Sequence, residues 1–494
     1  MRISLFFLSF LFSLCCLSQK NELATPEQDE RNYKVIPIGQ SGVVTLAKSE
    51  EPPFKKNKKW MISLYDNSFS IAWEKPLFVE AHYYIRGFYF NKSNLYILFG
   101  EFNTNKVKIA LLDIASGSIE SFDVSFIARF SINSFTTINK FIYLNGTYKN
   151  QAALASVNIE EKSFKLLESG FTGKSAIECI EVDTINNRTI VVFSNTIKKI
   201  STITIKTYQG SSLTGTVRLP VPGLENLVNG KLSVVNKDEL IISGAYFITK
   251  GSNSPEGIYI TKLDKTFTQI FIKFYPISEL KNFMSYIPEE PKDDLENIED
   301  KLLKKQNHGK ERHIHFNLLL HEPLLLNGEY VIVAEVNFPT YRSESRMITT
   351  YVNSSPVNTM QTYSVFDGWL YTHSIVCGFD MQGGLTWENF FVMGDVKTTS
   401  QIPKIQVTHN DNRMTLSYST SKSIKTEVIK NSQLLDTKEY INPSNENIKN
   451  PYFSNLEYWY DNYYIAYSLQ KIKKQKNEAS KEKPIEFFFN KITY

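Results

Sequence analysis

One hairpin pattern recurs along this chain, in which an aromatic residue follows an aspartate at the seventh position after it. The pairs are Asp66 and Trp73, Asp264 and Phe271, and Asp380 and Trp387. A fourth copy starts at Asp113 and keeps a turn glycine, Gly117, but has Glu120 in the aromatic position. In each copy an apolar strand ends at the aspartate, a short turn follows, and a second strand begins. Aspartate caps its own backbone in such a turn and glycine tolerates positive φ, so the pattern predicts β-hairpins.

A second repeated element is a short apolar strand that carries a small residue. Four of these residues follow one another at intervals of 46, 48 and 50 residues, and they are Gly100, Gly146, Ser194 and Gly244. Four strands of this length in a unit of about 40–50 residues indicate a β-propeller. A β-sandwich contains similar strands but no unit repeated at a constant period. The pattern therefore favours an all-β propeller fold.

Eight candidate units fill residues 32–494, which we expect to form a single propeller domain with insertions at 278–311 and 337–368. The units begin near Tyr33, Tyr83, Ser131, Ala176, Lys231, Ile314, Ile405 and Leu456. The eighth unit has only three strands, and the N-terminal segment 19–31 could supply the fourth. Closing the ring in this way covers two sheet edges that would otherwise favour aggregation. A ring of seven blades, with an irregular first or last unit, is the alternative.

The stretch GFDMQGGLTWEN, residues 378–389, has the look of a ligand-binding motif. It departs from the Asp box of bacterial sialidases, S-x-D-x-G-x-T-W, because Gly378 replaces the serine and the spacing from Asp380 to Thr386 is longer. A metal-binding loop needs several converging oxygen ligands, whereas Asp380 stands alone. We therefore interpret the stretch as a structural hairpin between the third and fourth strands of a blade.

The first 18 residues have the features of a secretory signal peptide. Arg2 is followed by an apolar run from Ile3 to Leu17, and small residues precede a cleavage site before Gln19. The run is shorter than the roughly 20 residues of a membrane span, and no later stretch qualifies. We expect export to the periplasm, the cell surface or the medium. A lipoprotein signal is the alternative, although Leu14 occupies the position before Cys15 where a small residue belongs.

Charge and cysteine content exclude several classes of function. The 55 Lys and Arg residues are interspersed with 51 Asp and Glu residues, without the basic stripe that nucleic-acid binding requires. Cleavage would leave only Cys179 and Cys377, both in apolar runs, where cysteine acts mainly as a small buried hydrophobe. We expect a monomer that has no cofactor, no metal site and no nucleic-acid partner.

Four long connections leave the predicted blades, and the alternation of strand direction places all four at one face. They are residues 49–59, 278–311, 337–368 and 471–484. Leu295, Ile298, Leu302 and Leu303 have helical spacing and predict one short helix in the second. Long loops on a rigid scaffold often carry binding residues, so this face is our predicted recognition surface. Tolerated insertion without a function is the alternative.

The connection at 337–368 has the strongest binding signal. It and its flank contain residue types that are enriched in interface hot spots, namely Tyr341, Arg342, Arg346, Tyr351, Tyr363 and Trp369. These residues predict a site for a protein or glycan ligand. The alternative is that the aromatic residues, Trp369 among them, only pack the connection onto the sixth blade.

Catalysis is the second functional hypothesis, in the form of a polysaccharide-active hydrolase or lyase. Glu335 and Asp367 flank the connection at 337–368 and are the candidate acids, since glycoside hydrolysis needs two facing carboxylates. His313 and His315 share one face of a strand but make at most half of a zinc site. The chain has no G-x-S-x-G nucleophile motif. No catalytic residue is assigned.

Three segments resemble a group of uncharacterised exported bacterial proteins. The segments are AEVNFPTYR, VFDGWLYTHSIVCGFDMQGGLTW and YWYDNYYIAYSLQKI. Those proteins repeat a unit of apolar strand, D-x-x-G-x-x-x-W hairpin and apolar strand, and the resemblance covers most of the chain after the signal peptide. It implies a propeller fold and export. Because its motifs are structural, it implies no catalytic residue.

Overall fold

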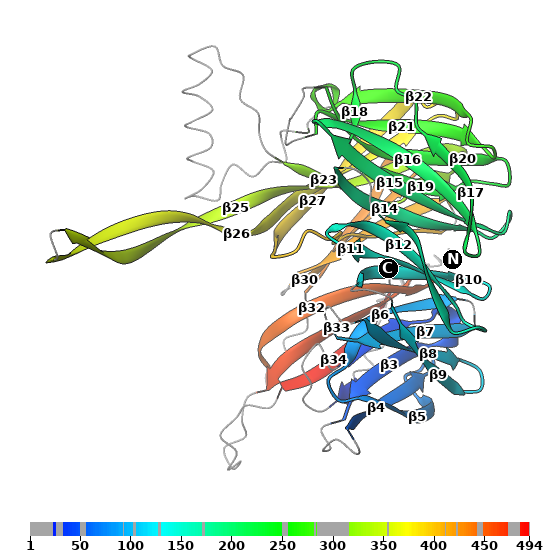
Figure 1. The fold of residues 1–494 in the computed structure, drawn as a ribbon, viewed down its shortest axis with the longest axis vertical. Coiled ribbons are helices and arrows are strands. Elements are labelled where there is room, and N and C mark those ends of the chain that lie inside the picture. Colours follow the sequence, from blue (N-terminus) through cyan, green and yellow to red (C-terminus); the bar gives the residue numbers. More distant parts are fainter. Residues whose placement is uncertain are drawn as a thin grey trace, which may run out of the picture.

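The computed structural model describes most of the chain, and Figure 1 shows its fold. The described residues are 23–25, 33–49, 56–91, 93–101, 105–126, 130–169, 173–248, 255–280, 283, 316–352, 355–410, 412–420, 423–441, 448–472 and 485–493. The predicted signal peptide, the predicted helix at 295–303 and most of the connections at 49–59, 278–311 and 471–484 lie outside these residues.

The described strands form eight antiparallel sheets. The first four sheets contain β2 (Tyr33–Pro37), β3 (Val43–Lys48), β4 (Asn57–Tyr65) and β5 (Ile71–Glu80); β6 (Tyr84–Asn91), β7 (Asn94–Gly100), β8 (Lys106–Asp113) and β9 (Ile119–Ser125); β10 (Phe130–Ile138), β11 (Phe141–Tyr148), β12 (Gln151–Asn158) and β13 (Ser163–Ser169); and β14 (Lys174–Asp183), β15 (Arg188–Ile197), β16 (Ile200–Gln209) and β17 (Ser212–Arg218). Two single-turn 3-10 helices, η2 (Gly39–Ser41) and η3 (Ile277–Glu279), are the helical elements among the described residues.

The fifth to eighth sheets follow the same order. They contain β18 (Asn226–Leu227), β19 (Lys231–Val234), β20 (Glu239–Phe247), β21 (Gly257–Asp264) and β22 (Gln269–Pro276); β23 (Asn317–Leu320), β24 (Leu324–Leu326), β25 (Glu329–Val352), β26 (Ser355–Phe379) and β27 (Leu385–Thr398); β28 (Gln406–Asn410), β29 (Arg413–Ser419), β30 (Ser423–Lys430) and β31 (Gln433–Ile441); and β32 (Ile448–Tyr460), β33 (Tyr463–Ile472), β34 (Ile485–Thr493) and β1 (Leu23–Thr25). In the fifth and sixth sheets the first strand is split in two.

The N-terminal strand completes the eighth sheet, as the sequence predicts. Leu23 lies opposite Phe489 and Thr25 opposite Phe487, so β1 runs antiparallel to β34. The last sheet therefore takes three strands from the C-terminal end of the chain and one from the N-terminal end. This pairing covers the edge that β34 would otherwise expose.

Eight hydrophobic cores show that the sheets close into a ring. Each core joins two successive sheets, and the last of them joins the eighth sheet to the first through Trp459, Ile465, Val43 and Tyr65. A sandwich would bury one shared core between two layers. The predicted propeller is therefore confirmed, with eight blades rather than the alternative seven.

The aspartate hairpins are structural joints, and GFDMQGGLTWEN is one of them. Asp380 Oδ1 accepts hydrogen bonds from the backbone N–H groups of Gln382 (2.8 Å) and Gly384 (2.7 Å). Asp264 Oδ1 does the same for Thr266 (2.8 Å) and Thr268 (2.9 Å). The carboxylate therefore satisfies the turn's own donors, and the prediction of a structural turn is confirmed.

The aromatic residue of one hairpin packs on the hairpin of the next blade. Trp73 Nε1 donates to the carbonyl of Ile114, 3.0 Å away, and the indole lies over Gly117. Phe271 lies over Gly383 in the same way, and a Cβ at Gly383 would come within 2.5 Å of the Phe271 ring. The same contact, an aromatic ring on a turn glycine of the next blade, therefore recurs with the hairpin.

Strand alternation gives the ring two faces. The connections from second to third strands, with the crossovers between blades, form the long-loop face. The connections from first to second and from third to fourth strands form the short-turn face. Several turns on this second face have left-handed residues, including Asn139, Asn187, Asn327 and Asn431. Asparagine tolerates this conformation better than other non-glycine residues do, which explains its place in these tight hairpins.

The prediction of a loop at 337–368 is wrong. β25 and β26 continue through this segment as a regular two-stranded ladder that ends with Val352 opposite Ser355. Its sequence is rich in β-branched and aromatic residues alternating with polar ones, which suits a hairpin exposed on both faces. Figure 1 shows the two strands leaving the ring together and projecting well beyond it.

Candidate functional site

The projecting hairpin is the first candidate site, and we call residues 338–352 and 355–368 the arm. β23 pairs with β25 only as far as Asn337, and β27 pairs with β26 only from Trp369. Beyond these points the outer edges of both strands have no neighbouring strand among the described residues. The arm is therefore a two-stranded sheet with two open edges, attached to the sixth blade at one end.

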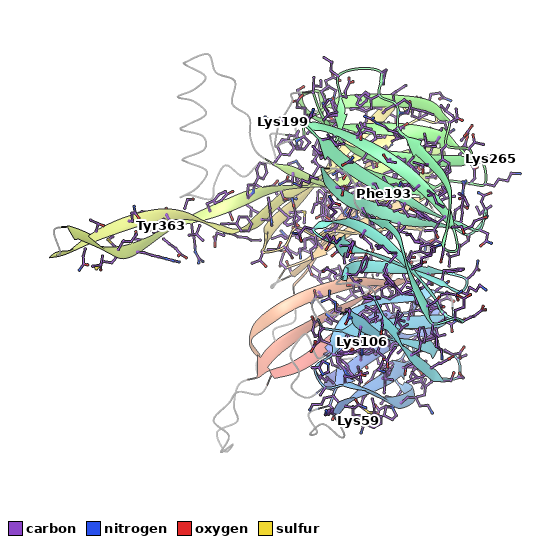
Figure 2. All side chains as sticks on the ribbon, viewed as in Figure 1. Lys59, Lys106, Phe193, Lys199, Lys265 and Tyr363 are labelled. Carbon is purple, nitrogen blue, oxygen red and sulfur yellow. The ribbon has the colours of Figure 1, made fainter. Side chains whose placement is uncertain are left out.

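One face of the arm carries charges. Arg342, Glu344 and Arg346 alternate along β25, and Tyr363 lies directly opposite Glu344. Glu344 accepts hydrogen bonds from Arg342 (2.7 Å) and Arg346 (3.3 Å), which lower the pKa of its carboxyl. The two arginines are thus already paired within the arm. Figure 2 shows Tyr363 on this hairpin, far from the ring.

The other face of the arm is uncharged and partly apolar. Tyr341 lies opposite Phe366, and Met347 lies opposite Met360. The exposed fractions are 49% for Tyr341, 42% for Phe366, 70% for Met347 and 75% for Met360. Serine and threonine fill the positions between the two pairs, and Ser345 Oγ lies 3.0 Å from Thr362 Oγ1. This face therefore exposes four large apolar side chains, two at the base of the arm and two farther along it.

The six binding residues predicted from the sequence do not form one cluster. Arg342, Arg346 and Tyr363 share the charged face, whereas Tyr341 lies on the uncharged face. Tyr351 lies in β25, and its side chain is outside the described set. Trp369 is partly buried against the core between the sixth and seventh blades, where it has the packing role of the alternative interpretation.

The sequence reasoning overlooked Met347, Met360 and Phe366. Part of the signal was available, because Met360 alternates with polar residues, although Ile348 and Val365 interrupt the alternation beside Met347 and Phe366. Reading the segment as a loop hid this alternation. Once the strand register is known, the three residues join Tyr341 on one face.

The base of the arm is held by an aromatic chain and an ion-pair group. The ring centroids of Tyr341 and Phe366 are 6.0 Å apart, and those of Phe366 and Trp369 are 5.3 Å apart. Asp367 forms ion pairs with Lys397 and with Arg342, and the hydrogen bond from Lys397 lowers the pKa of its carboxyl. Asp367 is thus a partner within the arm base.

Glu335, the other candidate acid, is fully buried in a structural contact. Its carboxylate accepts hydrogen bonds from the N–H groups of Lys404 and Ile405, each at 2.9 Å, and lies 2.8 Å from His321 Nε2. Lys404 and Ile405 belong to the crossover into the seventh blade, so Glu335 fastens two blades together.

The candidate acids do not face one another. Glu335 and the residues opposite Asp367 are at least five strand positions apart on β25, which corresponds to about 17 Å or more. Glycosidase carboxyl groups lie about 5–9.5 Å apart. This pair is therefore excluded as the two acids of a glycosidase.

The histidines do not assemble a metal centre within the described residues. His308, His313 and His315 lie outside them, and His321 bonds to Glu335. Burial lowers the pKa of His373 to about 4, and its ring packs edge-on against Phe283 at 5.1 Å. No group of three His, Cys, Asp or Glu side chains in the described part of the chain is placed to hold a metal ion.

Both remaining cysteines are free and buried, as the sequence predicts. Burial raises the pKa of Cys179 to about 12 and also raises the pKa of Cys377. A thiol with so high a pKa is a poor nucleophile because little thiolate forms.

Three cavities lie on the short-turn face, which the sequence reasoning had treated as structural only. A cavity of about 610 Å³ lies among the second, third and fourth blades. Cavities of about 240 and 350 Å³ lie between the sixth and seventh and between the seventh and eighth blades. Residues from several turns form their walls, so no single sequence motif predicts these cavities.

Several partly buried carboxyl groups have raised pKa values. Burial and the nearby charges of Glu322 and Asp183 raise the pKa of Glu181 to about 8. Burial raises the pKa of Glu427 and of Glu457 to about 7. These groups belong to the fourth, seventh and eighth blades, so they do not make one acidic site.

Comparison with known proteins does not assign the chain to a family. No protein-family model and no curated protein sequence matches the chain. A polysaccharide lyase, Uly1, is similar in structure with 10% identity and a TM-score of 0.43, over 96% of this chain and 99% of the lyase. The WD40 domain of Toxoplasma gondii coronin matches with 8% identity and a TM-score of 0.36, over 83% and 81%. These values are too low to transfer any function or site residue.

No helical segment among the described residues has both the length and the hydropathy needed to cross a bilayer.

Proposed function

We propose that this propeller is a binding protein that holds a protein partner on the uncharged face of its arm. The supporting observation is the exposure of Met347 and Met360, which lie opposite one another toward the far end of a hairpin whose contacts with the ring are at its base. Large exposed apolar patches with polar surroundings are typical of interaction surfaces.

Burial of this face gives a sufficient energetic reason for binding. Full burial of one methionine or phenylalanine side chain contributes about 1.5–3 kcal/mol. Methionine is flexible and polarisable, so a pair of methionines adapts well to a partner surface. Tyr341 and Phe366 extend the same face toward the ring, where Trp369 anchors them.

The open edges of the arm offer a second mode of contact. Pro339 and Pro356 are the prolines of the arm, and they lie near its base and its tip. Between them both strands keep their backbone donors and acceptors at edges without a neighbouring strand. A partner strand can add to such an edge through main-chain hydrogen bonds.

A protein partner fits this arrangement better than a glycan does. The side chains most suited to a charged or hydroxylated ligand, Arg342 and Arg346, are already bonded to Glu344. The available face instead offers apolar groups and hydroxyls. The enzymatic alternative has no comparable support, since Glu335 and Asp367 are each engaged in structural contacts.

Site-specific photo-crosslinking in the producing cells tests this proposal. A photoreactive residue at Met347 should give one defined protein adduct, which the double substitution Met360→Asp and Phe366→Asp should abolish. The matched control places the same residue at Ile348, on the opposite face of the same strand, and should give little of that adduct. Equal adducts at both positions, or arm-dependent retention by a glycan instead of a protein, would contradict the proposal.

We also propose that the chain is exported. Cleavage before Gln19 would leave β1 intact, so the processed chain could still complete the eighth sheet. The buried thiols of Cys179 and Cys377 would not interfere in an oxidising compartment. Mass measurement of the secreted protein should give an N-terminus at Gln19, and retention of residues 1–18 in the cell would contradict export.

A further inference from the structure

The largest of the three cavities described above lies on the face opposite the arm. Its volume of about 610 Å³ falls in the range of small-molecule sites, about 300–1,000 Å³. Its walls come from the β10–β11 and β12–β13 turns of the third blade and from the β14–β15 and β16–β17 turns of the fourth. Tyr96 and Leu111 of the second blade complete them.

The aromatic part of the wall is fixed in place by contacts between blades. Phe141 packs on Gly210, where a Cβ would come within 2.8 Å of the ring. The hydroxyl of Tyr143 donates to the carbonyl of Gly210 at 2.6 Å, and Tyr208 is almost completely buried. The two buried tyrosines therefore hold the wall rigid beneath the partly exposed Phe141, and a preformed wall lowers the cost of binding.

The rim of the cavity is made of side-chain amides. Asn139 and Asn187 occupy corresponding left-handed turn positions in adjacent blades, both with φ of 51°. Asn139 Nδ2 donates to Asn187 Oδ1 at 2.6 Å. This bond uses one of the four hydrogen-bonding positions of each amide. Gln209 adds a third amide to the same lining.

The charged groups of the lining are already paired. Lys140 forms an ion pair with Glu160 at 2.9 Å. Arg188 bonds to Asp183 at 2.8 Å and to the carbonyl of Lys265 at 3.0 Å. An ionic ligand would have to displace one of these partners, whereas a neutral ligand would not.

We propose that this cavity binds a short neutral oligosaccharide. Phe141, the partly exposed aromatic ring of the lining, can receive the apolar face of a sugar, and planar amides bond its hydroxyl groups as donors and acceptors at once. A phosphorylated ligand would require a cation without a partner, and a lipid chain would leave the amide rim unsatisfied. The proposal is independent of the arm, which lies on the other face, so either can fail without the other.

Titration calorimetry on the full processed chain tests this proposal. The probes are the neutral trisaccharides maltotriose, cellotriose, mannotriose, xylotriose and chitotriose, with trigalacturonate as the charged counterpart. We expect at least one neutral probe to bind with a Kd below about 1 mM. Chemical-shift changes should concentrate in residues 138–141, 187–189 and 208–210.

A pair of glycine substitutions provides the matched control. The double variant Asn139→Gly and Asn187→Gly removes two amides while glycine keeps the left-handed backbone, and we expect about tenfold weaker binding. Asn431→Gly makes the same change at a left-handed turn on the same face, outside this cavity, and should bind as the unmodified protein does. Absence of binding by every neutral probe, tighter binding of trigalacturonate, or equal loss in both variants would overturn the proposal.

Discussion

The two faces of this propeller differ in how they present side chains. On the long-loop face, a single hairpin carries exposed apolar residues away from the ring, and its order depends on contacts within the hairpin. On the short-turn face, turns of the third and fourth blades meet around a cavity whose walls are fixed by packing between blades. The arm presents a projecting surface, whereas the cavity is an open hollow built from turns that are individually ordinary.

This difference teaches that insertion length and site formation are separate properties of a propeller. The blades with the longest described hairpin and the largest described cavity are not the same. The third and fourth blades have two-residue turns at Lys149–Asn150 and Lys198–Lys199 on the long-loop face, yet they supply most of the cavity wall on the other. Long connections therefore identify only the sites that project.

The two candidate acids give the largest expected contrast between ring and arm. Glu335→Ala removes the acceptor for two buried N–H groups and for His321, and we expect it to lower the free energy of unfolding by about 3 kcal/mol. Asp367→Ala removes only solvent-screened ion pairs at the arm base, and we expect a much smaller loss. Urea denaturation measures both, and equal losses would show that Glu335 does not fasten the blades.

The turn glycines give a second contrast, this time within the short-turn face. Gly383 and Gly328 both have positive φ, but only Gly383 lies against a ring, that of Phe271. Alanine should therefore cost about 1 kcal/mol from strain at Gly328 and about 2–3 kcal/mol at Gly383, where overpacking adds to the strain. Thermal unfolding of Gly383→Ala and Gly328→Ala tests this. Equal effects would mean that the contact between Phe271 and Gly383 does not contribute to the free energy of unfolding.

The buried carboxyls predict a stability that falls in mild alkali. The folded state raises the pKa of Glu181 from 4.5 to about 8, so it holds a proton that the unfolded chain has released. The resulting stability is complete below the unfolded pKa and is lost as the pH rises through about 8. Glutamine carries no titrating proton, so the free energy of unfolding of Glu181→Gln should not fall in this way. Relative to the unmodified protein, we expect it to rise by about 2 kcal/mol between pH 6 and pH 9. Parallel pH profiles for the two proteins would show that this carboxyl is not buried.

The propeller ring could be predicted from the sequence because the patterns that indicate it are local and repeated. The spacing of Gly100, Gly146 and Gly244 indicated the unit, and the missing fourth strand of the last unit pointed to an N-terminal strand. The cavity was not readable, because Asn139 and Asn187 each look like ordinary turn residues. Their meeting depends on how two blades are placed, which no local pattern specifies.

The arm could be predicted only in part, for the same reason. The unusual composition of 337–368 marked the segment, and Tyr341, Arg342, Arg346 and Tyr363 do lie on the arm. Their division between two faces follows from the strand register, which a segment interpreted as a loop does not have. The role of Glu335 was hidden because the two backbone N–H groups that it accepts from lie about 70 residues away in the chain.

The smallest expected effect on stability concerns the arm itself. Replacing residues 341–366 with a two-residue Asn-Gly turn removes contacts that lie almost wholly within the hairpin, so we expect a change below about 0.5 kcal/mol. Amide hydrogen exchange should agree, because an isolated two-stranded hairpin is only marginally stable and its amides should exchange faster than those of β20 in the ring. The same shortened variant should no longer co-purify with the partner protein identified by crosslinking, while keeping oligosaccharide binding at Asn139 and Asn187. A large loss of stability would instead mean that the arm supports the ring, and its exposed methionines would then need another explanation.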